Sequence, residues 1–289
     1  FMTVSLAALG IAAALLITTA PRTSWFMSLL LGGVVGLFPP VSYGLWLGQA
    51  NLLILPLLAL AFRGVYPGLT LMLASGVKIY PITGLVALWD RPDRWKQMAL
   101  ASAAGLAILL LQWPVGLPAI SNLGPDAYWS NQSINGFLSR LALVPGWIPS
   151  DAPLGAIDLG LVVVLGYFTL RLLARARFQP FTGVLALSLW FGSVAAPKNS
   201  LWNFVPLLLC LALGLQQARR HPGPAITMFL SVCLMGIQLI VWGVTLRGGA
   251  IPRSEYANPW VLWTSSLGLM AALFIGAATA RLISARERV

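Results

Sequence analysis

Lys78 is the side chain whose type and position most clearly indicate chemistry, because it places a cation in the segment GVKIYP between two short apolar stretches. A lone lysine at the centre of a bilayer costs roughly 2.5 to 3.5 kcal/mol on insertion scales, and Pro81 cannot donate a helical hydrogen bond. We therefore expect the helix to break near Lys78. The ammonium would then lie at a membrane surface, where it could either bind a phosphate or snorkel to the lipid headgroups.

A second group of polar side chains lies in the segment YWSNQSINGFLSRL, which holds Trp129, Asn131, Gln132, Asn135 and Arg140. Sugar hydroxyls take amides as hydrogen-bond partners, and the apolar face of a sugar stacks on aromatic rings. The segment therefore suits a carbohydrate ligand. The alternative is a loop that satisfies its own polar groups.

Amides also stand where predicted membrane spans begin or break. Gln49 and Asn51 open one span in GLWLGQANLLILP, and Lys198 and Asn203 mark a break in APKNSLWNFVPLL. These side chains could bind a sugar or cap the helix ends. Asp158 lies inside an apolar stretch, where an unpaired carboxylate is costly, so we expect it to have a structural partner.

Several other kinds of chemistry are poorly supported. The chain has one histidine, His221, and two cysteines inside apolar stretches, so we expect no metal site and no cofactor. Glycine-rich phosphate loops, HExxH and GxSxG are absent from the sequence. The net charge of +11 is spread over small clusters between apolar stretches, which indicates membrane topology and no nucleic-acid surface.

The elements that must position these residues are membrane-spanning helices. Hydrophobic residues make up 58% of the chain and charged residues only 9%, against about 25% charged in a soluble domain. Several apolar stretches reach the roughly 20 residues that a helix needs to cross a bilayer, without the alternation of a membrane barrel. We predict an all-α polytopic membrane protein, one transmembrane domain over residues 1–289, with about nine full spans. They lie at 2–20, 24–38, 49–62, 97–113, 153–172, 181–196, 201–216, 224–246 and 259–280.

The orientation of the spans follows from the basic residues. A short hairpin that breaks and re-enters at Lys78 places 13 of the 18 lysines and arginines on the cytoplasmic side. The alternative, a single long span with the opposite orientation, places 11 inside and 6 outside, with Lys78 in mid-membrane, so the charges favour the hairpin. The long polar and aromatic loop at about 114–152 is then extracytoplasmic. Phe1 stands inside an apolar stretch, and we expect the chain to be N-terminally incomplete, with a further span upstream.

Four segments in order resemble glycosyltransferase family 87: GQANLLILPLLALAFR at 48–63, SGVKIYPITGLVALWDRPDRWKQ at 75–97, YWSNQSINGFLSRL at 128–141 and APKNSLWNFVPLL at 196–208. The likeness covers nearly the whole chain from about residue 25. Members of this family are polytopic enzymes of the GT-C fold that resemble polyprenol-phosphate-mannose-dependent mannosyltransferases. The resemblance implies a GT-C-like bundle in the plasma membrane, with its active face extracytoplasmic.

The resemblance also implies a reaction. A sugar, mannose by this likeness, passes with inversion from a polyprenyl-phosphate donor to a lipid or glycan acceptor among the membrane lipids. Lys78 would stabilise the departing phosphate, with help from Arg140. The residues that would bind the sugar or acceptor are Gln49, Asn51, Tyr80, Trp129, Asn131, Gln132, Asn135, Lys198 and Asn203.

Two positions depart from the family pattern. The family's catalytic acid lies between its first span and the next, so we expect the general base upstream of Phe1, and a fragment without it would be inactive. Family members also often carry histidine where this chain has Trp202 and Asn203. Two other functions stay open: a secondary transporter, which would need a second helix break paired with the one at Lys78, and a non-catalytic membrane scaffold.

Overall fold

The computed structural model describes most of the chain, and the regular elements of that part are helices. One isolated antiparallel bridge joins Asn131 to Ser200. The described residues are 2–18, 33, 37–47, 50–112, 127–128, 130–149, 151–175, 181–196, 199–246 and 253–285. The predicted all-α membrane architecture is confirmed.

Short 3-10 helices, labelled η, alternate with longer α-helices along the chain. The elements before the long loop are α1 (Met2–Ile17), α3 (Pro39–Trp46), η1 (Ala50–Leu53), α4 (Ile54–Phe62), α5 (Pro67–Val77), η2 (Tyr80–Leu88) and α6 (Arg94–Gln112). Those after it are α7 (Ile134–Leu141), α8 (Leu154–Arg175), α9 (Phe181–Ala195), η5 (Leu201–Phe204), α10 (Leu207–Gln217), α11 (Pro222–Leu246), η6 (Arg253–Ala257), α12 (Pro259–Thr264) and α13 (Leu267–Ala285).

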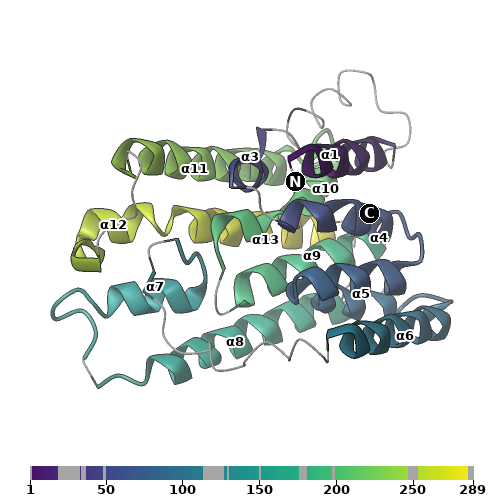
Figure 1. Ribbon diagram of the computed structural model, residues 1–289, viewed down its shortest axis with the longest axis horizontal. Helices are drawn as coiled ribbons and strands as arrows, with labels where there is room; N and C mark the ends of the chain where they lie inside the picture. The colour runs from purple at the N-terminus through teal and green to yellow at the C-terminus, as the bar shows by residue number, and fades with distance from the viewer. Residues whose placement is uncertain are drawn as a thin grey trace.

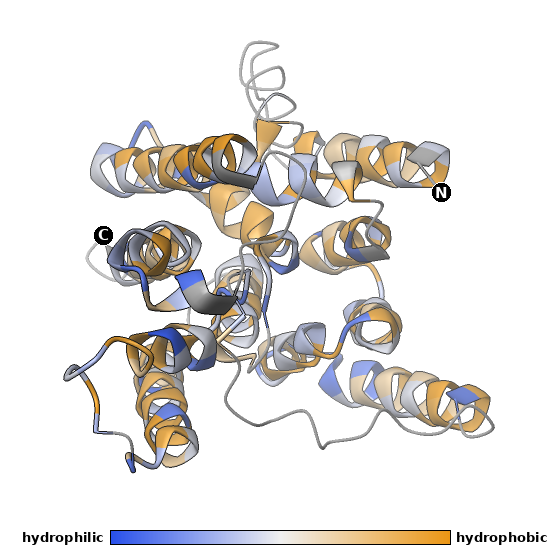
Figure 2. Ribbon diagram, turned by 60° about the vertical axis from the view of Figure 1, so that its left-hand side comes forward, coloured by the Kyte–Doolittle hydropathy of each residue, from blue (hydrophilic) through white to orange (hydrophobic). Residues whose placement is uncertain are grey.

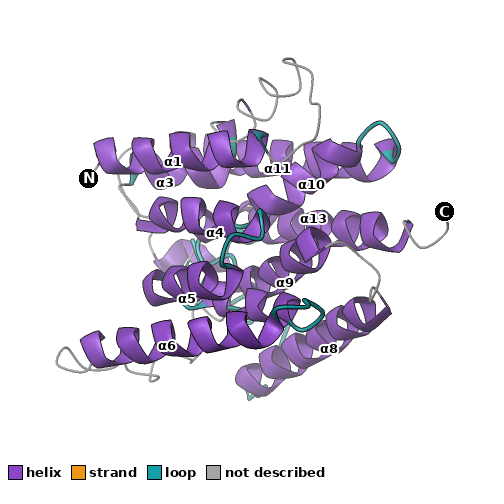
Figure 3. Ribbon diagram, turned by 90° about the vertical axis from the view of Figure 1, so that its right-hand side faces the viewer, coloured by secondary structure: helices purple, strands orange, loops and turns teal. Residues whose placement is uncertain are grey.

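These elements lie side by side in one bundle with α9 at its centre (Figure 1). Helix α9 packs against η2, α8, α10 and α13, and most of its side chains are buried. Helices α4, α5 and α6 form one side of the bundle (Figure 3). Helices α7 and α12 contact each other at one end, at the left of Figure 1.

The surface of the bundle is apolar, as a bilayer requires. Apolar residues cover much of the helices in Figure 2, and on α8 they include Leu159, Val163 and Phe168, each at least 60% exposed. Three helical segments among the described residues are long and apolar enough to cross a membrane: Leu154–Ala174, Pro222–Val244 and Pro259–Ser284. The other apolar helices are shorter, and most of the predicted span 24–38 lies outside the described residues.

The predicted break at Lys78 is present. Helix α5 ends at Val77, the backbone of Lys78 is extended (φ −146°, ψ 131°), and the chain continues as η2. The segment then folds back, since a Cβ added to Gly84 would stand 2.9 Å from Cδ2 of Leu71. Lys78 therefore caps a helical hairpin.

The other end of α5 is tied to α6 by polar groups. The backbone amide of Gly68 donates to Oε1 of Gln97 (3.2 Å), and Nε2 of Gln97 donates to Asp93 (2.8 Å). Asp93 also pairs with Arg91 at 2.8 Å. The hydrogen bonds from Arg91 and Gln97 lower the pKa of the Asp93 carboxyl to about 2. These contacts fix the end of the hairpin farthest from Lys78.

Close packing of α9 on α13 depends on a glycine. The indole Nε1 of Trp190 donates to the carbonyl of Ala272 at 2.6 Å, and the ring lies flat against Gly276. A Cβ at Gly276 would overlap the ring atoms of Trp190. The central helix can approach α13 only because position 276 has no side chain.

We predict that Gly276→Ala lowers the free energy of unfolding by about 1 to 3 kcal/mol, because the added methyl group forces α9 and α13 apart. Thermal unfolding of the protein in detergent measures the change. Gly160→Ala on α8 is the matched control, because a Cβ there meets nothing within 4 Å and alanine favours the helix. Equal stability of the two variants would contradict this account of the α9–α13 contact.

Candidate functional site

The polar segment at 130–141 is folded around the side chain of Asn131. Its Oδ1 accepts hydrogen bonds from the Ser133 amide (3.2 Å), the Ser133 hydroxyl (2.8 Å) and the Asn199 amide (3.0 Å). The Ser133 hydroxyl in turn accepts from the amide of Gly136 (3.0 Å) and caps α7. Asn131 therefore holds the loop together, as the alternative reading of this segment expected.

The segment is also joined to the break after α9. The Gln132 amide donates to the Asn199 carbonyl, and the Asn199 side chain donates to the carbonyl of Ser193 in the last turns of α9. With the bridge between Asn131 and Ser200, these contacts attach the polar segment to the central helix. Two segments that the sequence singled out separately thus form one structure.

Arg140 is fully buried and bonded to backbone oxygens. Its Nη1 donates to the carbonyls of Tyr128 (3.0 Å) and Asn131 (2.8 Å), and its Nη2 donates to the carbonyl of Ser265 (3.3 Å). The Gln132 side chain donates to the same Ser265 carbonyl. These bonds join α7, the start of the polar segment and the turn between α12 and α13. A phosphate could reach this guanidinium only by displacing them.

A pair of amides joins two other turns at this end of the bundle. Nδ2 of Asn51 in η1 donates to Oδ1 of Asn203 in η5 at 2.6 Å. Asn51 is fully buried and Asn203 is 9% exposed. Within the described part of the chain, Oδ1 of Asn51 finds no hydrogen-bond partner. An unpartnered buried acceptor is costly, and a ligand hydroxyl or a water molecule would satisfy it.

Lys78 lies partly exposed at the same end of the bundle. Nε2 of Gln112, the last residue of α6, donates to the carbonyl of Gly76 at 3.4 Å, so the hairpin tip stands where the long loop begins. The next residues of the hairpin pack on α9, because Thr83 donates to the Ser188 carbonyl at 2.8 Å. A Cβ at Gly192 would touch the carbonyl of Tyr80. The hairpin and the polar segment thus meet the last turns of the same helix.

Tyr80 and Asn135 have different environments. Tyr80 is 6% exposed, and its hydroxyl has no hydrogen-bond partner in the described part of the chain. Nδ2 of Asn135 donates to Oδ2 of Asp158 at 3.3 Å, which ties α7 to α8. Asp158 thus has a structural partner, as its position in an apolar stretch led us to expect.

Three predicted site residues lie outside the described part of the chain: Gln49, Trp129 and Lys198. Among the residues that are described, no group of three potential metal ligands occurs.

Aromatic residues near the amide pair were not predicted as a site. The ring of Tyr43 in α3 lies 5.4 Å from that of Trp202 in η5, between centroids. From the sequence, Trp202 was notable as one of the two residues that stand where family members often carry histidine. The polar residue Asn203, next to Trp202, marked this turn as a candidate site in the sequence. No local sequence pattern connects Tyr43 with Trp202.

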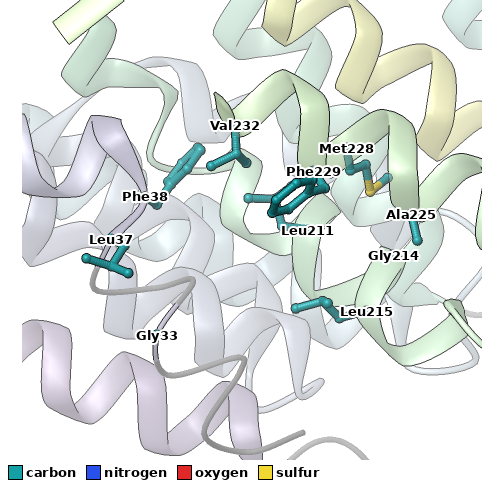
Figure 4. A pocket seen from close by; sticks show the side chains of 10 residues that line it. All are labelled: Gly33, Leu37, Phe38, Leu211, Gly214, Leu215, Ala225, Met228, Phe229 and Val232. Carbon is teal, nitrogen blue, oxygen red and sulfur yellow. The ribbon is translucent and has the colours of Figure 1, made fainter. Parts of the chain in front are cut away.

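Two apolar grooves open on the surface of the bundle. One, of about 320 Å³, lies between α10, α11 and the residues Gly33, Leu37 and Phe38 that precede α3 (Figure 4). The other, of about 550 Å³, lies between α7, α8 and α13, and its lining includes Ile134, Phe137, Phe168 and Met270. The second begins under the polar segment and could hold a hydrocarbon chain.

Comparison with known proteins gives one match. The profile of Glycosyltransferase family 87 matches residues 1–197, which hold the hairpin at Lys78 and the polar segment. No curated protein and no solved structure matches the chain.

We predict that Arg140→Lys lowers the free energy of unfolding by at least about 3 kcal/mol, because an ammonium cannot reach all three carbonyls, which lie on two separate segments, and each bond from a charged donor contributes about 1.5 to 3 kcal/mol. Thermal unfolding in detergent measures the loss. Arg220→Lys, at an exposed position, is the control and should unfold like the wild type. If Arg140→Lys also did so, the bonds to the carbonyls would not hold this end of the bundle.

Proposed function

Because the chain belongs to glycosyltransferase family 87, we propose that this membrane glycosyltransferase takes its sugar from a polyprenyl-phosphate donor and transfers it at the extracytoplasmic end of the bundle. The observation that carries the proposal is the position of Lys78, partly exposed at a helix break, beside the end of α9 that also bears the polar segment. The family favours this function over a transporter or a scaffold.

Lys78 meets the main chemical requirement of such a reaction. When the bond between the anomeric carbon and the phosphate oxygen breaks, the electron pair stays on the phosphate, which gains negative charge. An ammonium placed near that oxygen stabilises the charge more in the transition state than in the donor. The break between α5 and η2 lets the lysine approach a lipid phosphate at the membrane surface.

The acceptor completes the reaction from the opposite face of the sugar. Its hydroxyl oxygen attacks the anomeric carbon, its proton passes to a general base, and the configuration inverts. We assign this base to none of the described residues. Asp158 is the described carboxylate that bonds to the polar segment, but it is engaged by Asn135 and serves as a clamp between α7 and α8.

The other polar residues form two groups, according to whether their hydrogen-bonding groups already have partners within the protein. In the pair of Asn51 and Asn203, Oδ1 of Asn51 has no hydrogen-bond partner among the described residues, so we assign the pair to a sugar hydroxyl, and we assign Tyr80 on the hairpin to the same sugar. The residues that already bond within the protein hold these groups in position: Asn131, Gln132, Asn135 and Arg140. Gln49, Trp129 and Lys198 stay predicted sugar or acceptor ligands.

The proposal also covers the site of the lipid chain, the identity of the sugar and membrane, and the acceptor. The apolar groove between α7, α8 and α13 would hold part of the polyprenyl chain. Mannose as the sugar and the plasma membrane as the location rest on the resemblance of four segments to this family. The acceptor would be a lipid or glycan at the same membrane surface.

We expect Lys78→Ala to lower the transfer rate about 10²- to 10³-fold, which is the usual cost of removing one transition-state charge stabiliser. The assay measures sugar transfer from a polyprenyl-phosphate mannose in membranes that hold the complete enzyme. Lys78→Arg keeps the charge and should retain more activity than the alanine variant. Lys96→Ala, at the opposite end of the hairpin, is the control. Unchanged turnover in Lys78→Ala would refute the phosphate role.

Asp158→Asn tests whether the carboxylate is a clamp or the base. Asparagine keeps an oxygen that can accept the hydrogen bond from Asn135, so a clamp should retain transfer activity within a few fold of the wild type. A general base would lose its function, with a fall of about 10²- to 10⁴-fold. Asp158→Leu should lower the stability by about 1 to 3 kcal/mol, because it removes the hydrogen bond that Asn135 donates to the carboxylate. Loss of transfer in a stably folded Asp158→Asn protein would reassign this residue as the base.

A further inference from the structure

Aromatic rings from distant parts of the chain gather beside the amide pair. Tyr43 in α3 lies 5.4 Å from Trp202 in η5 and 5.8 Å from Trp242 in α11, between ring centroids. Trp242 is 2% exposed, whereas Tyr43 and Trp202 are partly exposed. Tyr43 thus contacts the buried indole of Trp242 as well as Trp202, and Tyr43 and Trp202 each keep part of their surface exposed.

A second pair of rings is built in the same way. Tyr128 is 46% exposed and lies edge-to-face on Tyr256, which is 5% exposed, at 6.5 Å between centroids. The carbonyl of Tyr128 is held by Arg140 at 3.0 Å, so the backbone that carries this ring is fixed. The bridge between Asn131 and Ser200 brings the backbone that follows Tyr128 beside the chain that leads into Trp202. The five rings of Tyr43, Tyr128, Trp202, Trp242 and Tyr256 are called here the aromatic platform.

The platform differs from the aromatic belt at a membrane surface. Belt residues such as Trp260 and Trp263, at 61% and 56% exposed, project from one helix into the lipid. Each exposed ring of the platform rests instead on a ring from another element. Such pre-ordered rings lose little side-chain entropy when a ligand stacks on them.

Hydrogen-bonding groups stand next to the platform. Asn203 follows Trp202 in η5, and Asn51, its partner at 2.6 Å, carries the buried oxygen that lacks a partner in the described part of the chain. A sugar ring offers an apolar face to stack on an aromatic ring and hydroxyls to donate to amide oxygens. An acyl or prenyl chain would use the rings and leave the amide oxygen unsatisfied.

The platform is separate from the hairpin that would hold the donor phosphate. Its elements pack on one another, α3 against η5 and α11, whereas η2 packs on α5, α6 and α9. The two neighbourhoods meet where the chain passes from α9 into η5. A donor whose phosphate lies at Lys78 would place its sugar between them, which leaves the platform for a second sugar.

We infer that the aromatic platform binds a sugar ring of the acceptor, so that the acceptor is a glycan or the glycosylated headgroup of a lipid. The assignment of this sugar to the acceptor rests on the proposed function. The binding of carbohydrate by Tyr43, Tyr128 and Trp202 does not depend on it.

The test is saturation-transfer difference NMR with mannobiose and the full-length protein in detergent. The wild type should bind, and Trp202→Ala and Tyr128→Ala should each raise the dissociation constant about tenfold, because a stacked ring contributes roughly 1 to 1.5 kcal/mol. Tyr43→Phe should bind like the wild type, since the ring remains. Trp260→Ala is the control for loss of an exposed tryptophan.

The outcomes separate the platform from the donor site. Trp202→Phe preserves a ring and guards against misfolding, and thermal unfolding checks each variant. Lys78→Ala should still bind mannobiose. If the wild type did not bind, or if folded Trp202→Ala and Tyr128→Ala both bound equally well, the platform would be refuted even where transfer depends on Lys78. Ring-dependent binding together with transfer by the complete enzyme that does not depend on Lys78 would support the platform and refute the donor assignment.

Discussion

Arg140 has no access to water, and its guanidinium therefore needs oxygen acceptors inside the protein. It finds them on the backbones of Tyr128 and Asn131, just before α7, and on that of Ser265, which is far away in the chain. The Asn131 side chain then accepts a hydrogen bond from the amide of Asn199, and so the polar segment is attached to the chain that leaves α9. The position of η5, and with it the pairing of Asn203 with Asn51, follows from this series of bonds.

The packing of the central helix α9 against its neighbours also positions this end of the bundle. Helix α9 can lie at the centre because Gly276 admits the ring of Trp190, and the hairpin can lean on α9 because Gly192 leaves room for the backbone at Tyr80. A glycosyltransferase needs a cation and hydrogen-bonding groups around one sugar, but a hydrocarbon bilayer can supply neither. Here short helices and turns bring such groups into the protein at one end, while apolar residues on longer helices such as α8 face the lipid.

The break at Lys78 could be predicted because its cause is local: a charge and a proline within four residues cannot continue an apolar helix. The partner of Asp158 was expected for a similar reason, since a buried carboxylate needs one. The role of Arg140 could not be predicted, because the sequence does not say which carbonyls approach it. The contact of Tyr43 with Trp202 was missed because it joins residues separated by most of the chain, and no periodicity records such a pair.

The lengths of the helices have a consequence for the surrounding lipid. Helix α11 has 25 residues and is about 37 Å long, whereas α5 has 11 residues and is about 16 Å long. A hydrocarbon core of ~30 Å is therefore thicker than α5 is long. A bilayer relieves such a mismatch in part by thinning, and beside α5 the thinned region would border Lys78. A lipid phosphate there would sit lower than its neighbours in the leaflet, and the enzyme would reach it without extracting the lipid from the membrane.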